Sequence, residues 1–233
     1  MRSHLPRLPL SVPVALLSLA LLVVATCGGC RVSPPVGMSL LTGDPCEPPC
    51  WQGLIPGVST HEEVNEFIRT SRFVNPQTLY VSALRRAGGQ RVGVSIRWRR
   101  TVGGGSPSNN FVIVGGVLES IIIYPDYDLT LERLVDRYGP PEKYVASLPI
   151  GGPLYYEVRL FYPTYGFTAD LVVAYDDGTL QPESRVASVW YFRAAPLERF
   201  MELRCEAGLG GCPPEKSLQY LRDWPGYGPI ELE

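Results

Sequence analysis

Two stretches of the chain alternate apolar and polar residues with a period of two, and this pattern restricts the fold more than any other feature. RVGVSIRWR, residues 91–99, has valine, isoleucine or tryptophan at every second position. FTADLVVAY, residues 167–175, repeats the pattern, with Thr168 and Asp170 in polar positions. Because successive side chains of a strand point to opposite faces, each stretch predicts an antiparallel strand with one buried and one wet face.

Helix start signals lie ahead of both sets of strands. The first helix begins at Ser59 or Thr60, because either residue forms a capping box with a glutamate three positions later. The second begins near Asp128 or Thr130 and ends before a Gly-Pro-Pro stop signal. Two further helices are expected at the C-terminus, at Pro196–Arg204 and Glu215–Arg222.

The order of helix and strands therefore occurs twice. The expected strands are Leu79–Leu84, Arg91–Arg99, Phe111–Val114, Val117–Tyr124, Tyr155–Tyr162, Phe167–Tyr175 and Val186–Phe192. We predict an α+β fold of two similar units, each a helix packed on a small antiparallel sheet, followed by C-terminal helices. The expected divisions are a signal segment at 1–29, a flexible tether at 30–45, a first unit at 46–126 and a second at 127–233.

The N-terminal segment has the layout of a secretory signal, because Arg2 and Arg7 precede a long uncharged apolar run. A retained membrane anchor is the alternative. The stretch VVATCGGC resembles the end of a bacterial lipoprotein signal, in which a cysteine after small residues carries lipid. The resemblance implies lipidation of Cys27, with Cys30 as the alternative. It also implies an extracytoplasmic protein held at the cell membrane by a lipid anchor.

Four further cysteines, Cys46, Cys50, Cys205 and Cys212, indicate structural disulfides, because exported thiols tend to be oxidised. The first two are separated by three residues, whereas the thioredoxin-type redox motif has two. Proximity favours the local pairs, Cys46 with Cys50 and Cys205 with Cys212, and crosslinks between the two clusters stay open. A four-thiolate zinc site would require the clusters to meet, and we expect neither metal nor cofactor.

A cluster of arginines is the strongest charge feature of the chain. Its members are Arg85, Arg86, Arg91, Arg97, Arg99 and Arg100. On the solvent face of a strand they would suit an anionic partner, such as lipid headgroups, an anionic envelope polymer or an acidic envelope protein. The alternative is a solvated face that discourages edge-to-edge pairing.

Aromatic residues concentrate in the later strands. We expect Tyr155, Phe161 and Tyr191 to share a face and to form a tyrosine-rich recognition surface. The alternative is that the C-terminal helices cover this face.

Two stretches resemble a known family. IPGVSTHEEV, residues 55–64, resembles the opening of BamE/SmpA-type small outer-membrane lipoproteins, and LERLVDRYGPP, residues 131–141, resembles a later segment of such domains. Tandem copies of that helix-plus-sheet unit also build the beta-lactamase inhibitor protein fold, which has a concave binding surface. The resemblance implies a fold and names no ligand.

Composition and motifs restrict the function. The formal net charge of −2 argues against a nucleic-acid partner. His61 is the single histidine outside the signal segment, and the chain has no serine-elbow, Walker-type or H-E-x-x-H motif. We predict a membrane-tethered extracytoplasmic binding protein without catalytic activity. The alternatives are a secreted inhibitor-like module that covers an enzyme, and an enzyme with an unrecognised carboxylate site.

Overall fold

The computed structural model describes residues 38–85, 89–100, 108–148, 155–206 and 218–230, all within the unit Pro34–Glu233. Its helices are α2 (Ser39–Thr42), α3 (His61–Thr70), α4 (Leu131–Tyr138) and α5 (Leu197–Glu206), with short 3-10 helices η1 (Pro76–Thr78) and η2 (Pro163–Tyr165). The strands are β1 (Tyr80–Arg85), β2 (Arg91–Trp98), β3 (Asn109–Val114), β4 (Val117–Ile123), β5 (Lys143–Ser147), β6 (Tyr155–Tyr162), β7 (Phe167–Ala174), β8 (Thr179–Leu180), β9 (Val186–Tyr191) and β10 (Gly228–Pro229).

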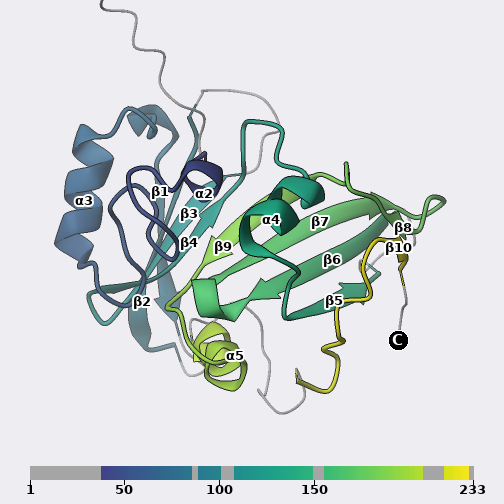
Figure 1. Cartoon of the computed structure of the whole chain (residues 1–233). Helices are drawn as coiled ribbons and strands as arrows, with labels where there is room; N and C mark the ends of the chain where they lie inside the picture. The colour runs from purple at the N-terminus through teal and green to yellow at the C-terminus, as the bar shows by residue number, and fades with distance from the viewer. Residues whose placement is uncertain (1–37, 86–88, 101–107, 149–154, 207–217, 231–233) are drawn as a thin grey trace, which may run out of the picture. The chain divides into compact units, whose positions relative to one another are not determined.

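One antiparallel sheet of eight strands dominates the fold, in the order β1-β2-β3-β4-β9-β7-β6-β5 (Figure 1). The prediction of two units, each a helix on its own small sheet, is wrong. The last strand of the first half, β4, pairs with β9 of the second half, with Ile121 opposite Tyr191 and Ile123 opposite Val189. The strands of both halves therefore belong to one continuous sheet.

The sequence of β4 explains why the sheet does not stop there. Ile121, Ile122 and Ile123 are consecutive and all buried, so both faces of β4 are apolar at its end. An edge strand with two apolar faces would leave this surface and a row of backbone groups in water. Pairing with β9 covers this apolar surface and satisfies the backbone groups of β4. The boundary expected at residues 126 and 127 falls in the loop between β4 and α4.

The predicted alternation correctly gives the buried apolar faces of β2 and β7, but the opposite faces are only partly wet, because Ser95 and Thr168 are also buried. In β2, Val94, Ile96 and Trp98 are buried, and Arg97 between them is exposed. We call the surface that carries Trp98 the helix face of the sheet, because α3 and α4 pack on it, and the opposite surface the far face. Figure 1 shows α4 lying over β7 and β6 on the helix face.

Helix α3 begins where one of the two expected capping boxes places it. The Thr60 side chain accepts a hydrogen bond from the backbone N–H of Glu63, and the Glu63 carboxylate accepts the Thr60 backbone N–H at 2.7 Å. The pKa of Glu63 is lowered by the hydrogen bonds that its carboxylate accepts from the Thr60 backbone N–H and hydroxyl. Val64 and Phe67 then turn toward the core. Thr130 is the N-cap of helix α4, where its side chain accepts a hydrogen bond from the backbone N–H of Arg133 without a reciprocal capping box.

Residues 38–58, which we call the leading segment, lie between the two helices and fill the helix face. Trp51 is fully buried, with its ring 5.4 Å from that of Phe67, 5.9 Å from Trp98 and 6.0 Å from Phe111. The Gly57 N–H donates to the β4 backbone. The interval 30–45, expected as a tether, contains α2, and its Leu40 is buried.

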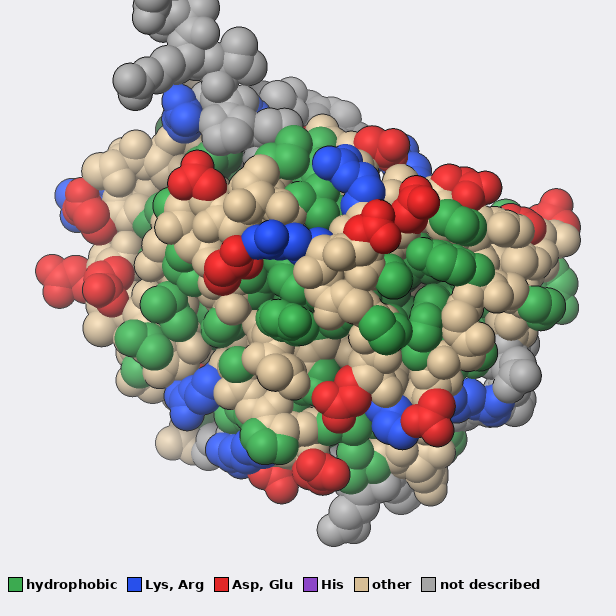
Figure 2. Space-filling view, in the orientation of Figure 1, with side chains coloured by type: hydrophobic (Ala, Val, Ile, Leu, Met, Phe, Trp, Pro, Cys, Tyr) green, Lys and Arg blue, Asp and Glu red, His purple; other side chains and the backbone are tan. Residues whose placement is uncertain are grey.

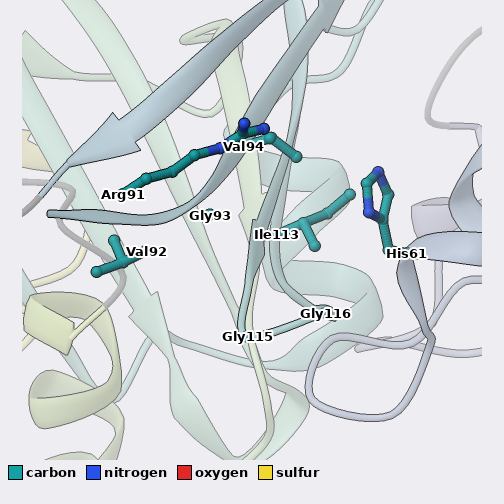
Figure 3. Close-up of a pocket in the computed structure, with 8 residues that line it drawn as sticks. All are labelled: His61, Arg91, Val92, Gly93, Val94, Ile113, Gly115 and Gly116. Carbon is teal, nitrogen blue, oxygen red and sulfur yellow. The ribbon is translucent and has the colours of Figure 1, made fainter.

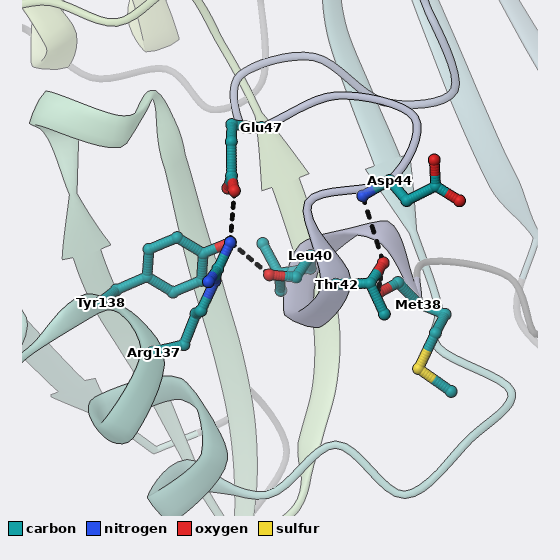
Figure 4. Close-up of polar contacts among 7 residues, drawn as sticks. All are labelled: Met38, Leu40, Thr42, Asp44, Glu47, Arg137 and Tyr138. Atoms are coloured by element: carbon teal, nitrogen blue, oxygen red, sulfur yellow. Dashed lines mark hydrogen bonds and ion pairs between the residues drawn. The ribbon is translucent and has the colours of Figure 1, made fainter.

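Polar contacts join the leading segment to α4 (Figure 4). The Tyr138 hydroxyl donates to the Leu40 carbonyl, and Arg137 forms an ion pair with Glu47. Burial raises the pKa of Tyr138 to about 12, so the hydroxyl stays a donor at neutral pH. Across this side of the molecule, acidic and basic side chains are interspersed with hydrophobic ones (Figure 2).

Helix α5 covers part of the far face. Phe161 of β6 and Phe192 pack with Phe200 and Met201 of α5 in a second, smaller core. Of the other predicted C-terminal helix, residues 215–217 lie outside the described residues, Leu218 is helical, and residues 219–220 form a turn. Glu157, Val172 and Ala187 lie on the far face beyond α5 and remain exposed.

Candidate functional site

A row of side chains crosses the far face at the border between its covered and exposed parts. The register places Ser188 of β9 opposite Asp170 of β7, Asp170 opposite Arg159 of β6, and Arg159 opposite Val145 of β5. Tyr124 follows β4 directly and begins the row next to β9. We call Tyr124, Ser188, Asp170 and Arg159 the polar row. Three neighbouring strands and the residue that follows β4 therefore each bring one polar side chain to the same line.

Asp170 is the centre of the polar row. Arg159 donates to it twice, from Nε to Oδ1 at 2.5 Å and from an Nη atom to Oδ2 at 3.0 Å. The Ser188 hydroxyl donates to the same Oδ2 at 3.0 Å. Both charged side chains are mostly buried, with exposed fractions of 27% for Arg159 and 19% for Asp170. A bidentate pair in such surroundings is stronger and more rigid than a surface ion pair.

Trp190 fixes the row from one side. The Arg159 guanidinium lies over its ring, 4.7 Å from the centroid. The indole Nε1 donates to the Ser188 hydroxyl at 3.0 Å. Trp190 also packs against the α5 cluster. The side chains of the row are therefore held in place by a cation–π contact and by the second core.

A cavity of about 340 Å³ opens beside the polar row. Its lining residues are Tyr124, Val145, Ser147, Glu157, Val158, Arg159, Asp170, Leu171, Val172, Ala187, Ser188 and Trp190. The lining combines an apolar floor with a few convergent polar groups, as small-molecule sites do.

Three polar groups of this cavity are free of protein partners within the described residues: the Tyr124 hydroxyl, the Glu157 carboxylate and the Ser147 hydroxyl. Burial raises the pKa of Tyr124, and the nearby Asp170 charge raises it further, while Arg159 opposes the shift. The Tyr124 hydroxyl therefore stays protonated and can both donate and accept a hydrogen bond.

A second hollow of about 290 Å³ lies beside the first turn of α3 (Figure 3). His61 and Arg91 are its two polar side chains with ionisable groups, and the rest of the lining is Val92, Val94, Ile113 and glycines. Figure 3 shows the Ile113 side chain pointing toward the imidazole of His61. Because this lining brings no acidic group and no network of hydrogen bonds to the hollow, the polar row is the better candidate site.

The structure describes five of the six arginines of the predicted anionic-partner patch. Arg97 is exposed on the far face, with its guanidinium 5.6 Å from the Tyr80 ring centroid. Arg100 forms an ion pair with Asp126 at 2.7 Å. Arg99 donates to Ser108, and Arg85 lies opposite Arg91 where β1 ends and β2 begins. Arg86 lies outside the described residues.

The predicted disulfide between Cys46 and Cys50 is confirmed, with their Cα atoms 5.7 Å apart. It closes a turn of the leading segment directly before Trp51. The side chain of Cys205 and all of Cys212, Cys27 and Cys30 lie outside the described residues.

The predicted recognition surface of Tyr155, Phe161 and Tyr191 is wrong. Tyr191 lies opposite Phe167 on the helix face and is buried, whereas Phe161 lies on the far face under α5. The alternative was that C-terminal helices cover this face, and α5 does cover Phe161. Tyr155 is half-buried.

Within the described ranges, no group of three or more His, Cys, Asp or Glu side chains is placed to hold a metal ion. None of the helices that the structure describes combines the length and the apolar character needed to cross a membrane.

Comparison with known proteins gives no match to a family model, to a curated protein or to a solved structure. The resemblance to BamE/SmpA-type lipoproteins therefore stays a prediction.

Sequence reasoning did not identify the polar row. The one sequence signal for the polar row was the alternation in β7, which predicted that Asp170 lies on a solvent-facing side of the strand. Its partners Arg159 and Ser188 come from other strands, and only the register brings the three together.

Proposed function

We propose that this chain is a lipid-anchored extracytoplasmic binding protein without catalytic activity, and that it binds a small ligand in the cavity beside the polar row. The observation that carries the proposal is the preorganised network of Arg159, Asp170, Ser188 and Trp190 along that cavity. A rigid network next to free polar groups supports binding, because little side-chain order is lost when the ligand arrives.

The polar groups of the cavity favour a ligand rich in hydroxyl groups, such as a sugar unit, because the unpartnered Glu157 carboxylate can accept hydrogen bonds from hydroxyls. Asp170 and Arg159 neutralise each other, so neither demands a charged partner. Donors and acceptors both remain within reach of a ligand, on the Tyr124 hydroxyl, the Glu157 carboxylate and the Ser147 hydroxyl. Hydroxyl groups can pair with each of these.

Calorimetric titration of the full chain with glucose, maltose and N-acetylglucosamine tests the ligand. We expect heat of binding for at least one sugar and a loss of about tenfold in affinity for Tyr124→Phe, which removes one hydrogen bond of about 1.4 kcal/mol. Tyr220→Phe is the matched control, because Tyr220 is exposed and outside the cavity lining. Absence of heat with all three sugars, or equal affinities for both variants, would refute the ligand class.

Two observations support a location outside the cytosol. The sequence before residue 30 has the layout of a lipoprotein signal, and the Cys46–Cys50 disulfide suits an oxidising compartment outside the cytosol.

Metabolic labelling with a fatty acid tests the anchor. We expect label on the wild-type protein and on only one of the single variants Cys27→Ala and Cys30→Ala. Label that survives in the double variant, or membrane association that neither substitution changes, would contradict a lipid anchor.

A further inference from the structure

The two outer edges of the eight-stranded sheet differ. At the β5 edge the C-terminal part of the chain closes the strand: the backbone N–H groups of Tyr144 and Arg222 each donate to the other's carbonyl at 2.9 Å. Trp224 packs edge-on against the Tyr144 ring, and Lys143 forms an ion pair with Asp223. The segment around Arg222 therefore covers this edge at Tyr144.

The β1 edge has no such cover in the described residues. β1 pairs with β2 on one side, and no described segment pairs with its other side. Every residue of β1 is exposed or half-buried, and the exposed fractions reach 58% for Tyr80 and 60% for Val81. Natural edge strands are protected by charges, prolines or bulges. From Tyr80 to Leu84 the strand has no charge and no proline, and its one irregularity falls at the end, between Leu84 and Arg85.

The sequence of β1 is complementary to itself when two copies run antiparallel about Ser82. In that register Ser82 faces Ser82 of the second copy, Val81 faces Ala83 on the helix face, and Tyr80 faces Leu84 on the far face. Residues directly opposite in an antiparallel pair share a face, and this register keeps every pair on one face. The register pairs the aromatic Tyr80 with the aliphatic Leu84, and the aliphatic Val81 with the small Ala83. It places no two arginines opposite each other.

We propose that a second copy of this chain docks on β1, so that two eight-stranded sheets join edge to edge across a twofold axis at Ser82. The contact is isologous, because the same strand serves on both sides, and it closes after two copies since the β5 edges are covered. A charged extended peptide is the poorer occupant, because β1 offers apolar side chains and backbone groups up to Leu84. The proposal does not depend on the cavity or on its ligand.

Cysteine crosslinking tests the register. Ser82→Cys places the two introduced thiols on directly opposed residues, whose Cα atoms lie about 4.5–5.5 Å apart, within the range for a disulfide. Tyr80→Cys is the control, because the same register separates its two copies by four residues, about 13 Å along the strand. With the full chain in mild detergent and oxidised glutathione, we expect a disulfide-linked dimer for Ser82→Cys in large excess over Tyr80→Cys and wild type.

A charge pair supplies an independent test by sedimentation equilibrium. Val81→Lys with Ala83→Lys brings like charges together twice, so we expect a monomer. Val81→Lys with Ala83→Glu brings opposite charges together twice, so we expect the dimer to return. Circular dichroism of both variants checks that each is folded, and both substitutions lie at exposed positions.

Three results would overturn the proposal. The first is crosslinking of Ser82→Cys at the level of Tyr80→Cys. The second is equal association of the two charge variants when both are folded. The third is crosslinking of Ser82→Cys to a different protein in membranes, without a product between two copies of this chain.

Discussion

Replacement of Trp51 by alanine should destabilise the fold more than most single substitutions. Its side chain is fully buried, and its ring contacts rings of α3, β2 and β3 together with Phe73. Burying an aromatic side chain removes about 150–250 Å² from water, which at about 25 cal/mol per Å² is worth about 4–6 kcal/mol. Measured losses for Trp→Ala in cores are about 3–5 kcal/mol. We expect about 4 kcal/mol for Trp51→Ala.

Urea unfolding followed by circular dichroism measures this loss. With a slope near 3 kcal/mol per M for a chain of this size, about 4 kcal/mol lowers the midpoint by about 1.3 M. Trp51→Phe should cost less, about 1–2 kcal/mol, because the buried indole N–H has no hydrogen-bond partner in the described residues and phenylalanine lacks that donor.

Val58→Ala is the control, since Val58 belongs to the same segment and is exposed. We expect its midpoint to stay close to wild type. If Trp51→Ala moved the midpoint no further than Val58→Ala, the leading segment would not be part of the core, and the account of the helix face would fail.

Four further predictions concern single contacts. Replacing Cys46 and Cys50 by serine should lower stability by about 2 kcal/mol, the loop-closure term for so short a loop, and a melting temperature that dithiothreitol leaves unchanged in wild type would refute this. Thr60→Ala should cost about 1 kcal/mol in the same unfolding assay by removing the cap of α3, and no change would refute that cap. The pKa of Glu63 is lowered in the folded state, so its contribution is present above its unfolded pKa and is lost as pH falls through the folded value. Glu63→Gln should therefore differ from wild type at pH 7 and converge with it in acid, and a pH-independent difference would contradict the capping box. Asp170→Asn should cost about 2 kcal/mol, because a mostly buried arginine loses its charged partner, and wild-type stability would show that the polar row is not coupled.

Local patterns predicted individual strands well. β6 begins and ends at Tyr155 and Tyr162 as expected, and the Thr60–Glu63 box fixed the start of α3. Both features depend on neighbours in the sequence. β5 was missed because KYVAS is short and its inward residues are Tyr144 and Ala146, of which alanine gives little apolar signal.

Relations between strands were not predictable from the same patterns. Alternation assigns Phe161 and Tyr191 to a face of their own strands, but only the pairing of β6, β7 and β9 decides whether the two faces coincide. They do not, and the expected aromatic surface does not exist. One local pattern did indicate that the strands of both halves form a single sheet. The apolar run Ile121–Ile123 is typical of a central strand rather than an edge strand.

The closure of β5 by Arg222 has a consequence for incomplete chains. A chain is made from its N-terminus, so β5 exists long before the residues that cover it. A product that stops before Arg222 would present two uncovered edges instead of one. Pairing through β1 alone ends at two molecules, whereas a molecule with two uncovered edges can add neighbours on both sides and grow into a filament. The segment around Arg222 would therefore limit such growth, and we expect chains truncated before Arg222 to associate more strongly than the full chain.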